Sequence, residues 1–216
     1  MNIRLLPARP PAAVIDPIVR VLVSVGVTPA FITTVGLLGN ILAAGLIVQG
    51  ELLAGGIVVL LASALDMLDG ALARTTGTAS RFGAMYDSVL DRFSEAVVLF
   101  GIAWYAFDQQ NREQVVLTFA AVVGSLMVSY VRARAEGLNL QLRDGIFTRA
   151  ERVVLTGAML ILGQLTIGLW ALAALTLFTA FQRLWIASAM LLAEDAPAKA
   201  SRTAAVRGTA KTAPRR

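Results

Sequence analysis

Six long apolar segments run through the chain, separated by short stretches that are rich in polar residues, glycine or proline. They cover approximately residues 30–49, 52–73, 83–107, 115–135, 152–168 and 169–192. Most of them reach the roughly 20 residues that an α-helix needs to cross the hydrocarbon core of a bilayer. The pattern predicts an all-α integral membrane protein with six transmembrane helices, the last two divided only around Gly163 to Gly168.

A shorter apolar segment, residues 12–25, precedes these spans and carries Asp16 and Arg20 at helical spacing. Because it is too short to cross a bilayer, it is typical of a helix that lies in the membrane interface. We expect this helix to end before Pro29, since a proline disfavours helical conformation in the residue that precedes it.

The end of the chain has a different composition. After Glu194 it is rich in Ala, Thr, Pro, Lys and Arg and shows no apolar periodicity, which predicts a disordered tail. The sequence therefore divides into a cytoplasmic N-terminal segment with an interfacial helix (residues 1–29), a six-helix domain (residues 30–194) and a basic cytoplasmic tail (residues 195–216).

The composition agrees with a location in a membrane. Hydrophobic residues make up 57% of the 216 residues, charged residues only 15%, and the mean hydropathy is +0.72. A soluble chain of this length needs a larger polar fraction to cover its surface. The net charge of +5 therefore favours anionic membrane lipids as a partner, and we expect no nucleic acid.

The basic residues are unevenly distributed between the two sides of the predicted membrane domain. Sixteen of the 19 lysines and arginines lie before the first span, between the second and third, around the fourth-to-fifth connection, or after the sixth. Only Arg112 lies on the other side. Cytoplasmic loops carry the excess of Lys and Arg, so we expect both termini in the cytoplasm of a prokaryote and the spans in its plasma membrane.

Four aspartates form two helical stripes within residues 65–93. Asp66 and Asp69 are three residues apart and share one helix face, whereas Asp87 and Asp91 are four apart on the next predicted helix. Because the connecting loop is short, we expect the two helices to be antiparallel neighbours whose acidic faces meet near the cytoplasmic boundary.

Such a cluster needs compensating charge. An Asp at mid-membrane costs about 2.5–3.5 kcal/mol on insertion scales, and neighbouring carboxylates repel one another as well. The chain has no Cys and no His, so any metal or acid–base chemistry must rest on carboxylates, which favour Mg²⁺ or Mn²⁺. The alternative interpretation, solvated helix ends, is plausible for one aspartate but not for four.

Small residues lie on the same helix faces as the aspartates. Gly70, Ala73 and Gly83 either allow close helix packing or leave space for a ligand beside the carboxylates. Next to four aspartates and Arg74, space for a nucleotide is the interpretation that we favour.

These residues follow the pattern D-x2-D-G-x2-A-R-x8-G-x3-D-x3-D, which resembles the signature of the CDP-alcohol phosphatidyltransferase family. Every spacing is kept, from Asp66 and Asp69 through Gly70, Ala73, Arg74, Gly83 and Asp87 to Asp91. The resemblance implies a six-helix membrane enzyme, commonly homodimeric, that transfers a phosphatidyl group from CDP-diacylglycerol to an alcohol and releases CMP. It also implies two bound metal ions, with Asp66, Asp69 and Asp87 as ligands and Asp91 as both ligand and proton acceptor.

The resemblance further implies a set of contacts to the CDP-lipid. The matching or adjoining positions are Asp69, Gly70, Ala73, Arg74, Ser80 and Gly83, together with the N-terminal segment Pro29, Ala30, Phe31, Ile32 and Thr33. Without the resemblance, an arginine at a helix end is more typical of a side chain that reaches for the membrane surface.

Residues 129–152, SYVRARAEGLNLQLRDGIFTRAER, resemble the S-Y-[KR]-A-R-A-E and R-x-E-R elements of the phosphatidylinositol phosphate synthase branch. The resemblance implies a phosphate pocket for inositol 1-phosphate that is formed by Ser129, Arg132, Arg134, Arg149 and Arg152. Many members of the branch carry lysine in place of Arg132 and proline in place of Ala150. The positive-inside bias alone explains the side of the membrane on which these arginines lie, but not their clustering at two helix ends.

Two other functions stay open at the level of the sequence. Glycerol 3-phosphate would satisfy the same arginines, which would make the protein a phosphatidylglycerophosphate synthase, and another small polar alcohol is a further candidate acceptor. An ion-coupled transporter is the non-enzyme alternative, because aspartates in membrane helices also form ion paths. The inverted repeats and broken central helices typical of transporters are not visible in the sequence.

Overall fold

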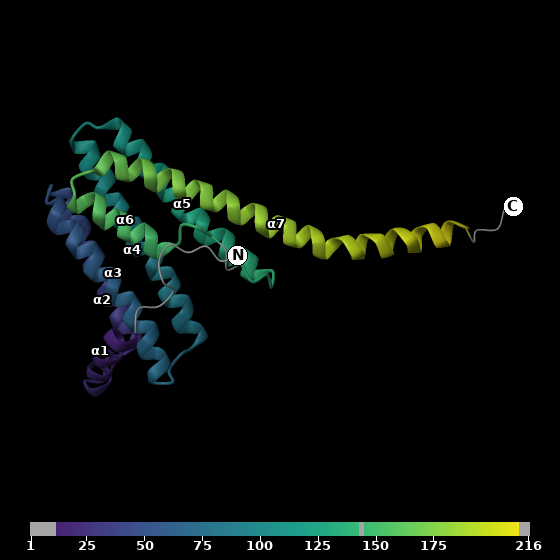
Figure 1. Cartoon of the computed structure of the whole chain (residues 1–216), viewed down its shortest axis with the longest axis horizontal. Helices are drawn as coiled ribbons and strands as arrows, with labels where there is room; N and C mark the ends of the chain where they lie inside the picture. Colours follow the sequence, from purple (N-terminus) through teal and green to yellow (C-terminus); the bar gives the residue numbers. More distant parts are fainter. Residues whose placement is uncertain (1–11, 143–144, 212–216) are drawn as a thin grey trace.

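The computed structural model describes residues 12–142 and 145–211, and these are arranged as a bundle of helices (Figure 1). The helices are α1 (Ala12–Ser24), α2 (Pro29–Val48), α3 (Leu52–Thr75), α4 (Arg81–Asp108), α5 (Arg112–Gly137), α6 (Arg149–Ile161) and α7 (Leu165–Lys211). The described residues contain no β-strand, so the all-α prediction is confirmed.

Four helices are long and apolar enough to cross a membrane by their length and composition. They are α2, α3, α5 and the part of α7 from Leu165 to Asp195. The fourth helix, α4, has 28 residues, but its first half carries several charged side chains. The sixth, α6, has 13 residues and a length of about 20 Å, which is less than the roughly 30 Å of the hydrocarbon core.

The boundary between the last two predicted spans was wrong. The expected ranges were 152–168 and 169–192, whereas α6 ends at Ile161 and α7 begins at Leu165. Gly163 adopts a φ of +66°, a conformation that glycine reaches without strain, and the Gln164 N–H donates to the Met159 carbonyl at 3.0 Å. This turn ends α6 seven residues earlier than the apolar pattern indicated.

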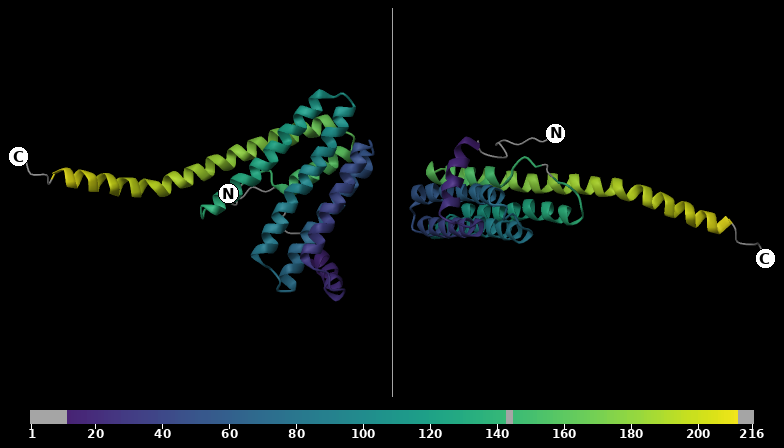
Figure 2. Two further views of the ribbon diagram at one scale, coloured as in Figure 1. Left: turned by 180° about the vertical axis from the view of Figure 1, so that it is seen from behind. Right: turned by 90° about the horizontal axis from the view of Figure 1, so that it is seen from below.

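The prediction of a disordered tail is wrong for residues 195–211, whose backbone continues α7 as a helix. Both views in Figure 2 show this part of α7 extending away from the other helices. The segment is rich in alanine, the residue with the highest helix propensity, and that propensity does not require an apolar face. Residues 212–216 lie outside the described part of the chain.

The helix α2 packs against both α3 and α4, while α6 packs against α3 and α7. Within the described residues, α3 and α4 are not among the closely packed pairs, and a polar space separates their acidic faces. Small residues let α2 take this central place. A Cβ on Gly39 would lie 2.8 Å from the Cβ of Ala62 on α3, and one on Gly101 of α4 would lie 2.9 Å from the Ala44 carbonyl.

The main apolar core lies at the end of the bundle that is remote from the α3–α4 connection. It contains Ile47 from the end of α2, Ile102 from the second half of α4, and Leu160 and Leu169 from either side of the α6–α7 turn. At the opposite end, α1 packs on α3 through a smaller cluster around Val19 and Leu72. Polar side chains occupy the space between these two apolar clusters.

Candidate active site

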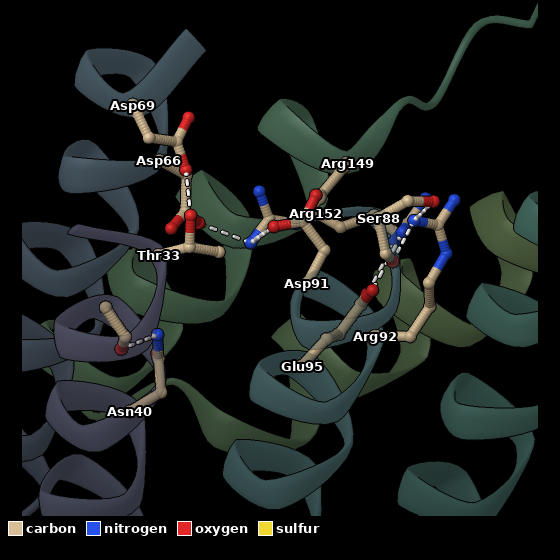
Figure 3. Close-up of polar contacts among 11 residues, drawn as sticks. Thr33, Asn40, Asp66, Asp69, Ser88, Asp91, Arg92, Glu95, Arg149 and Arg152 are labelled. Carbon is tan, nitrogen blue, oxygen red and sulfur yellow. Dashed lines mark hydrogen bonds and ion pairs between the residues drawn. The ribbon is translucent and has the colours of Figure 1, made fainter. Parts of the chain in front are cut away.

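The structure places the four aspartates around one polar space between α3 and α4, beside α2. Figure 3 shows Asp66 and Asp69 on α3 opposite Asp91 on α4. Asp66 precedes the end of α3 by nine residues, about 14 Å along the helix axis, so the site is recessed from the helix ends. Asp69 is only 5% exposed, and the Thr33 hydroxyl of α2 donates to its Oδ2 at 2.7 Å.

A glycine on α2 makes room for the first aspartate. A Cβ on Gly36 would lie 2.8 Å from Asp66 Oδ1 and 3.3 Å from the Ala62 carbonyl. One turn further along α2, the Asn40 side-chain amide donates to the Gly36 carbonyl at 2.9 Å. The face of α2 that turns toward the site is therefore shaped for close contact with the carboxylate of Asp66.

Arg149, the first residue of α6, joins the two acidic helices. Its Nη2 lies 2.5 Å from Asp66 Oδ2 and 3.0 Å from Asp91 Oδ1. The resemblance placed Arg149 in the pocket for the acceptor phosphate, and the structure brings it into direct contact with two of the four aspartates. Asp91 Oδ1 is nevertheless buried without accepting a hydrogen bond of good geometry.

The donor chemistry of this space fits a hard divalent cation. The available ligands are carboxylate oxygens, and the buried Asp91 Oδ1 accepts no hydrogen bond, although Arg149 Nη2 lies 3.0 Å away. Across the residues that the structure describes, no three Asp, Glu, His or Cys side chains gather as a ready-made metal cluster. This agrees with the contacts of Arg149, which already occupy Asp66 and Asp91.

A cavity of about 240 Å³ adjoins Asp69 and Asp87 at the cytoplasmic end expected from the charge distribution. Nine of the residues predicted to contact the CDP-lipid line it, namely Pro29, Ala30, Thr33, Asp69, Gly70, Ala73, Arg74, Ser80 and Gly83. The Ser80 hydroxyl also caps α4, since it accepts from the Gly83 N–H at 3.0 Å.

Two residues predicted for this cavity do not line it. Phe31 is 59% exposed, and Ile32 is buried in the apolar cluster under α1 with Val19. The reason is helical periodicity, since α2 turns Ala30 and Thr33 to one face and the two residues between them to others. Tyr86 lines the cavity instead, and its hydroxyl lies 3.1 Å from Thr34 Oγ1, but the sequence pattern did not point to it.

A second cavity of about 150 Å³ lies beside Asp91. Its lining residues are Asp91, Arg92, Glu95, Val128, Ser129, Arg132, Thr148, Arg149, Arg152 and Arg183. Five arginines thus face two acidic side chains, which leaves an excess of positive charge suited to an anion.

Four of the five predicted acceptor residues line this second cavity, and Arg134 does not. Arg134 follows Arg132 by two residues, which is about 200° around a helix, so it points to another face of α5. The assignment of Arg134 to this cavity was therefore wrong.

The structure adds Arg92, Glu95 and Arg183 to the cavity. Glu95 follows Asp91 by four residues, so the stripe of Gly83, Asp87 and Asp91 was a signal that could have identified it. Arg183 could not be identified in this way, because it lies inside an apolar span. The Arg183 Nη1 donates to the Val128 carbonyl at 2.8 Å, and Gly145, with a φ of +151°, lies so close that a Cβ there would be 2.6 Å from Arg183 Nε.

The N-terminus of α6 is fixed by a capping box. The Thr148 N–H donates to Glu151 Oε2 at 2.9 Å, and the side chain of Glu151 is buried. This cap sets the start of α6 at Arg149 and so determines where Arg149 and Arg152 enter the site. Both arginines lie in the first turn of the helix, where the helix dipole favours anions.

Comparison with known proteins agrees with the family resemblance seen in the sequence. The family described as CDP-alcohol phosphatidyltransferase matches residues 26–193 of the chain. The chain is 39% identical over 184 residues to the phosphatidylinositol phosphate synthase of Mycobacterium tuberculosis, an alignment that covers 80% of this chain and 85% of the relative.

Solved structures of a mycobacterial relative share the fold. The crystal structure of the M. tuberculosis phosphatidylinositol phosphate synthase with CDP-DAG bound matches with a TM-score of 0.76 at 35% identity, covering 82% of this chain and 94% of the other. The same enzyme in complex with manganese and citrate matches with a TM-score of 0.73 at 35% identity, covering 79% and 87% of the two chains.

Proposed function

Because this chain belongs to the CDP-alcohol phosphatidyltransferase family, we propose that it moves a phosphatidyl group from CDP-diacylglycerol to inositol 1-phosphate. The products are phosphatidylinositol phosphate and CMP. Membership of the family makes the chain a metal-dependent membrane transferase of phospholipid biosynthesis. The identity of the two substrates at this site is the part that we propose.

The observation that carries the proposal is the arginine-lined cavity beside Asp91. Arg149 and Arg152 enter it from the N-terminus of α6, and Arg183 enters it from α7. Such a concentration of guanidinium groups suits a phosphorylated alcohol, because Arg–phosphate hydrogen bonds are charge-assisted and often bidentate. An uncharged alcohol would leave this excess of positive charge without a partner.

The donor lipid is assigned to the cavity of about 240 Å³ beside Asp69 and Asp87, the donor cavity. Its nucleotide would lie against Gly70, Ala73 and Gly83, where the absence of larger side chains leaves space, with Arg74 near its phosphates. The mycobacterial relative was solved with CDP-DAG bound, which supports the same donor here. Its diacylglycerol chains would remain among the apolar helix faces that contact the bilayer.

The four aspartates would hold the metal, as Mg²⁺ or Mn²⁺ and as two ions. Asp66, Asp69, Asp87 and Asp91 supply only oxygen donors, and the mycobacterial relative has been solved with manganese. When bound, the metal supplies the positive charge that a pyrophosphate and a departing CMP require. Arg149 must then give up part of its contact with Asp66 and Asp91, which frees it for the acceptor phosphate.

Asp91 would act as the general base, since it lines the arginine-lined cavity one helical turn from Asp87, which lines the other cavity. Its carboxylate accepts the proton of the inositol hydroxyl while that oxygen forms a bond to the phosphorus that carries diacylglycerol. The bond between this phosphorus and the bridging oxygen breaks, and CMP leaves with the electron pair. Thr33 would hold Asp69 in place during the reaction through its 2.7 Å hydrogen bond.

The proposal includes an arrangement in the membrane. We assign six crossings, with α4 and, despite its length of about 20 Å, α6 completing the four apolar spans, because their charged faces turn toward the site rather than the lipid. Both termini and the site face the cytoplasm of a prokaryotic plasma membrane, with α1 in the interface, and the protein works as a homodimer.

Purified protein with CDP-diacylglycerol and a panel of alcohols tests the function, with CMP release as the signal. We expect inositol 1-phosphate to be used in preference to free inositol, glycerol, serine and ethanolamine. Glycerol 3-phosphate is the most informative competitor, because it carries the phosphate but lacks the ring hydroxyls. A preference for it would contradict the proposed acceptor, and use of an uncharged alcohol would contradict a phosphate pocket altogether.

A further inference from the structure

Glu95 and Arg152 form a two-point ion pair at the wall of the arginine-lined cavity (Figure 3). Arg152 Nε lies 2.6 Å from Glu95 Oε1, and Arg152 Nη2 lies 2.8 Å from Glu95 Oε2. The side chain of Arg152 is 2% exposed and that of Glu95 is 13% exposed. The pair is therefore nearly removed from solvent and has a defined geometry.

We propose that Glu95 is a positioning residue that fixes the guanidinium of Arg152 for the phosphate of the acceptor, an inference that rests on the proposed function. A guanidinium has five N–H donors in a planar fork. Glu95 accepts from the Nε edge and from one Nη2 hydrogen, which leaves the Nη1 hydrogens and the second Nη2 hydrogen available. With the plane of the fork held, these remaining donors have a fixed direction toward an anion.

The position of Arg152 in α6 explains why such a partner is needed. Arg152 lies in the first turn of the helix, where the helix dipole disfavours a cation. Arg149 in the same turn is held by Asp66 and Asp91, whereas Arg152 is held by Glu95. Glu95 follows Asp91 by one helical turn, so α4 provides in succession the proposed base and the residue that orients the acceptor-binding arginine.

Stability alone does not account for the pair. Burying two charges costs desolvation free energy, and replacing a buried ion pair by apolar side chains is often neutral or stabilising. The exposed pair between Arg132 and Glu136, separated by 2.9 Å, offers a matched comparison in the same region. Exposed pairs at this spacing contribute little, so Arg132 does not depend on Glu136 for its position.

The experiment compares the variants Glu95→Gln, Glu95→Asp and Glu136→Gln in CMP-release assays with CDP-diacylglycerol and inositol 1-phosphate. For Glu95→Gln we expect the acceptor KM to rise roughly ten-fold or more, as for a lost charge-assisted hydrogen bond, while the KM for CDP-diacylglycerol stays within about two-fold. Glu95→Asp keeps the negative charge on a shorter side chain, so the acceptor KM should rise less than in Glu95→Gln. Glu136→Gln should match the wild type.

A double variant tests whether Glu95 acts through Arg152. In the Arg152→Gln background, adding Glu95→Gln should raise the acceptor KM no further. A folded Glu95→Gln protein with a normal acceptor KM, or with both KM values raised equally, would overturn the inference. If Glu95→Gln does not fold, the test rests on Glu95→Asp, and a wild-type acceptor KM in that variant would also overturn the inference. Wild-type preference for an uncharged alcohol would instead reject the proposed function, and the role of Glu95 with it.

Discussion

The hydroxyl of Thr33 donates to Asp69 Oδ2 at 2.7 Å, which connects the first turns of α2 to the acidic stripe of α3. Thr33 also lines the donor cavity. We expect Thr33→Val, which keeps the shape and removes the hydroxyl, to weaken metal-dependent binding of CDP-diacylglycerol. The loss of a hydrogen bond to a charged group is worth about 1.5–3 kcal/mol, roughly ten-fold or more in affinity. Direct binding of the CDP-lipid to the folded variant provides the measurement.

Metal removal should abolish the reaction. The four aspartates have no His or Cys partners, so the ligand set is one that binds Mg²⁺ or Mn²⁺. CMP release should disappear in EDTA and return when either cation is added in excess. Full activity in chelator would contradict the assignment of Asp66, Asp69, Asp87 and Asp91 as metal ligands.

The variant Asp91→Asn separates catalysis from donor binding. Because the amide cannot accept the proton of the acceptor hydroxyl, we expect turnover to fall by about 10²- to 10⁴-fold. CDP-diacylglycerol should still bind, since Asp91 does not line the donor cavity. Near-normal turnover in Asp91→Asn would show that another group acts as the base.

The close approach of α2 to Asp66 gives a packing prediction. Gly36→Ala should disturb the site, because the new Cβ would lie 2.8 Å from Asp66 Oδ1. Overpacking of this kind typically costs about 1–3 kcal/mol, and here the aspartate must move. Gly45→Ala on the same helix is the control, since a Cβ there has no heavy atom within 4 Å. We expect a loss of activity and thermal stability in the first variant only.

Membrane topology is testable by single-cysteine labelling, because the chain contains no native cysteine. Gln109 lies in the connection between α4 and α5, and Thr203 lies far along α7. Six crossings place these two positions on opposite sides of the membrane. Labelling of both cysteines by an impermeant reagent from the same side would exclude this arrangement.

Much of the fold followed from local patterns in the sequence. The observed bounds of α2, α3 and α5 lie within three residues of the apolar segments 30–49, 52–73 and 115–135, because segment length and hydrophobicity depend only on nearby residues. The α6–α7 boundary was missed for a related reason. It depends on the backbone conformation of Gly163, and an unbroken apolar run conceals that turn.

The candidate site was predictable where one helix supplies a whole stripe. Asp66 with Asp69, and Asp87 with Asp91, are recognisable from their spacing alone. The contact of Arg149 with Asp66 joins positions 83 residues apart, and the approach of Arg183 to the second cavity depends on how α7 packs against α5. Such contacts are properties of tertiary packing, so no local pattern indicates them.

The two cavities draw on different parts of the chain, and this has a consequence for how such enzymes diversify. The donor cavity is lined by α2, α3 and α4. The arginine-lined cavity proposed for the acceptor, the acceptor cavity, is lined by α4, α5, α6 and α7, so α4 is common to both. Under the proposed function, substitutions after Asp108 reach only the acceptor cavity and leave the residues of the donor cavity unchanged. A change of acceptor alcohol then requires substitutions in only this later half, while the activated lipid and the residues that hold it stay the same.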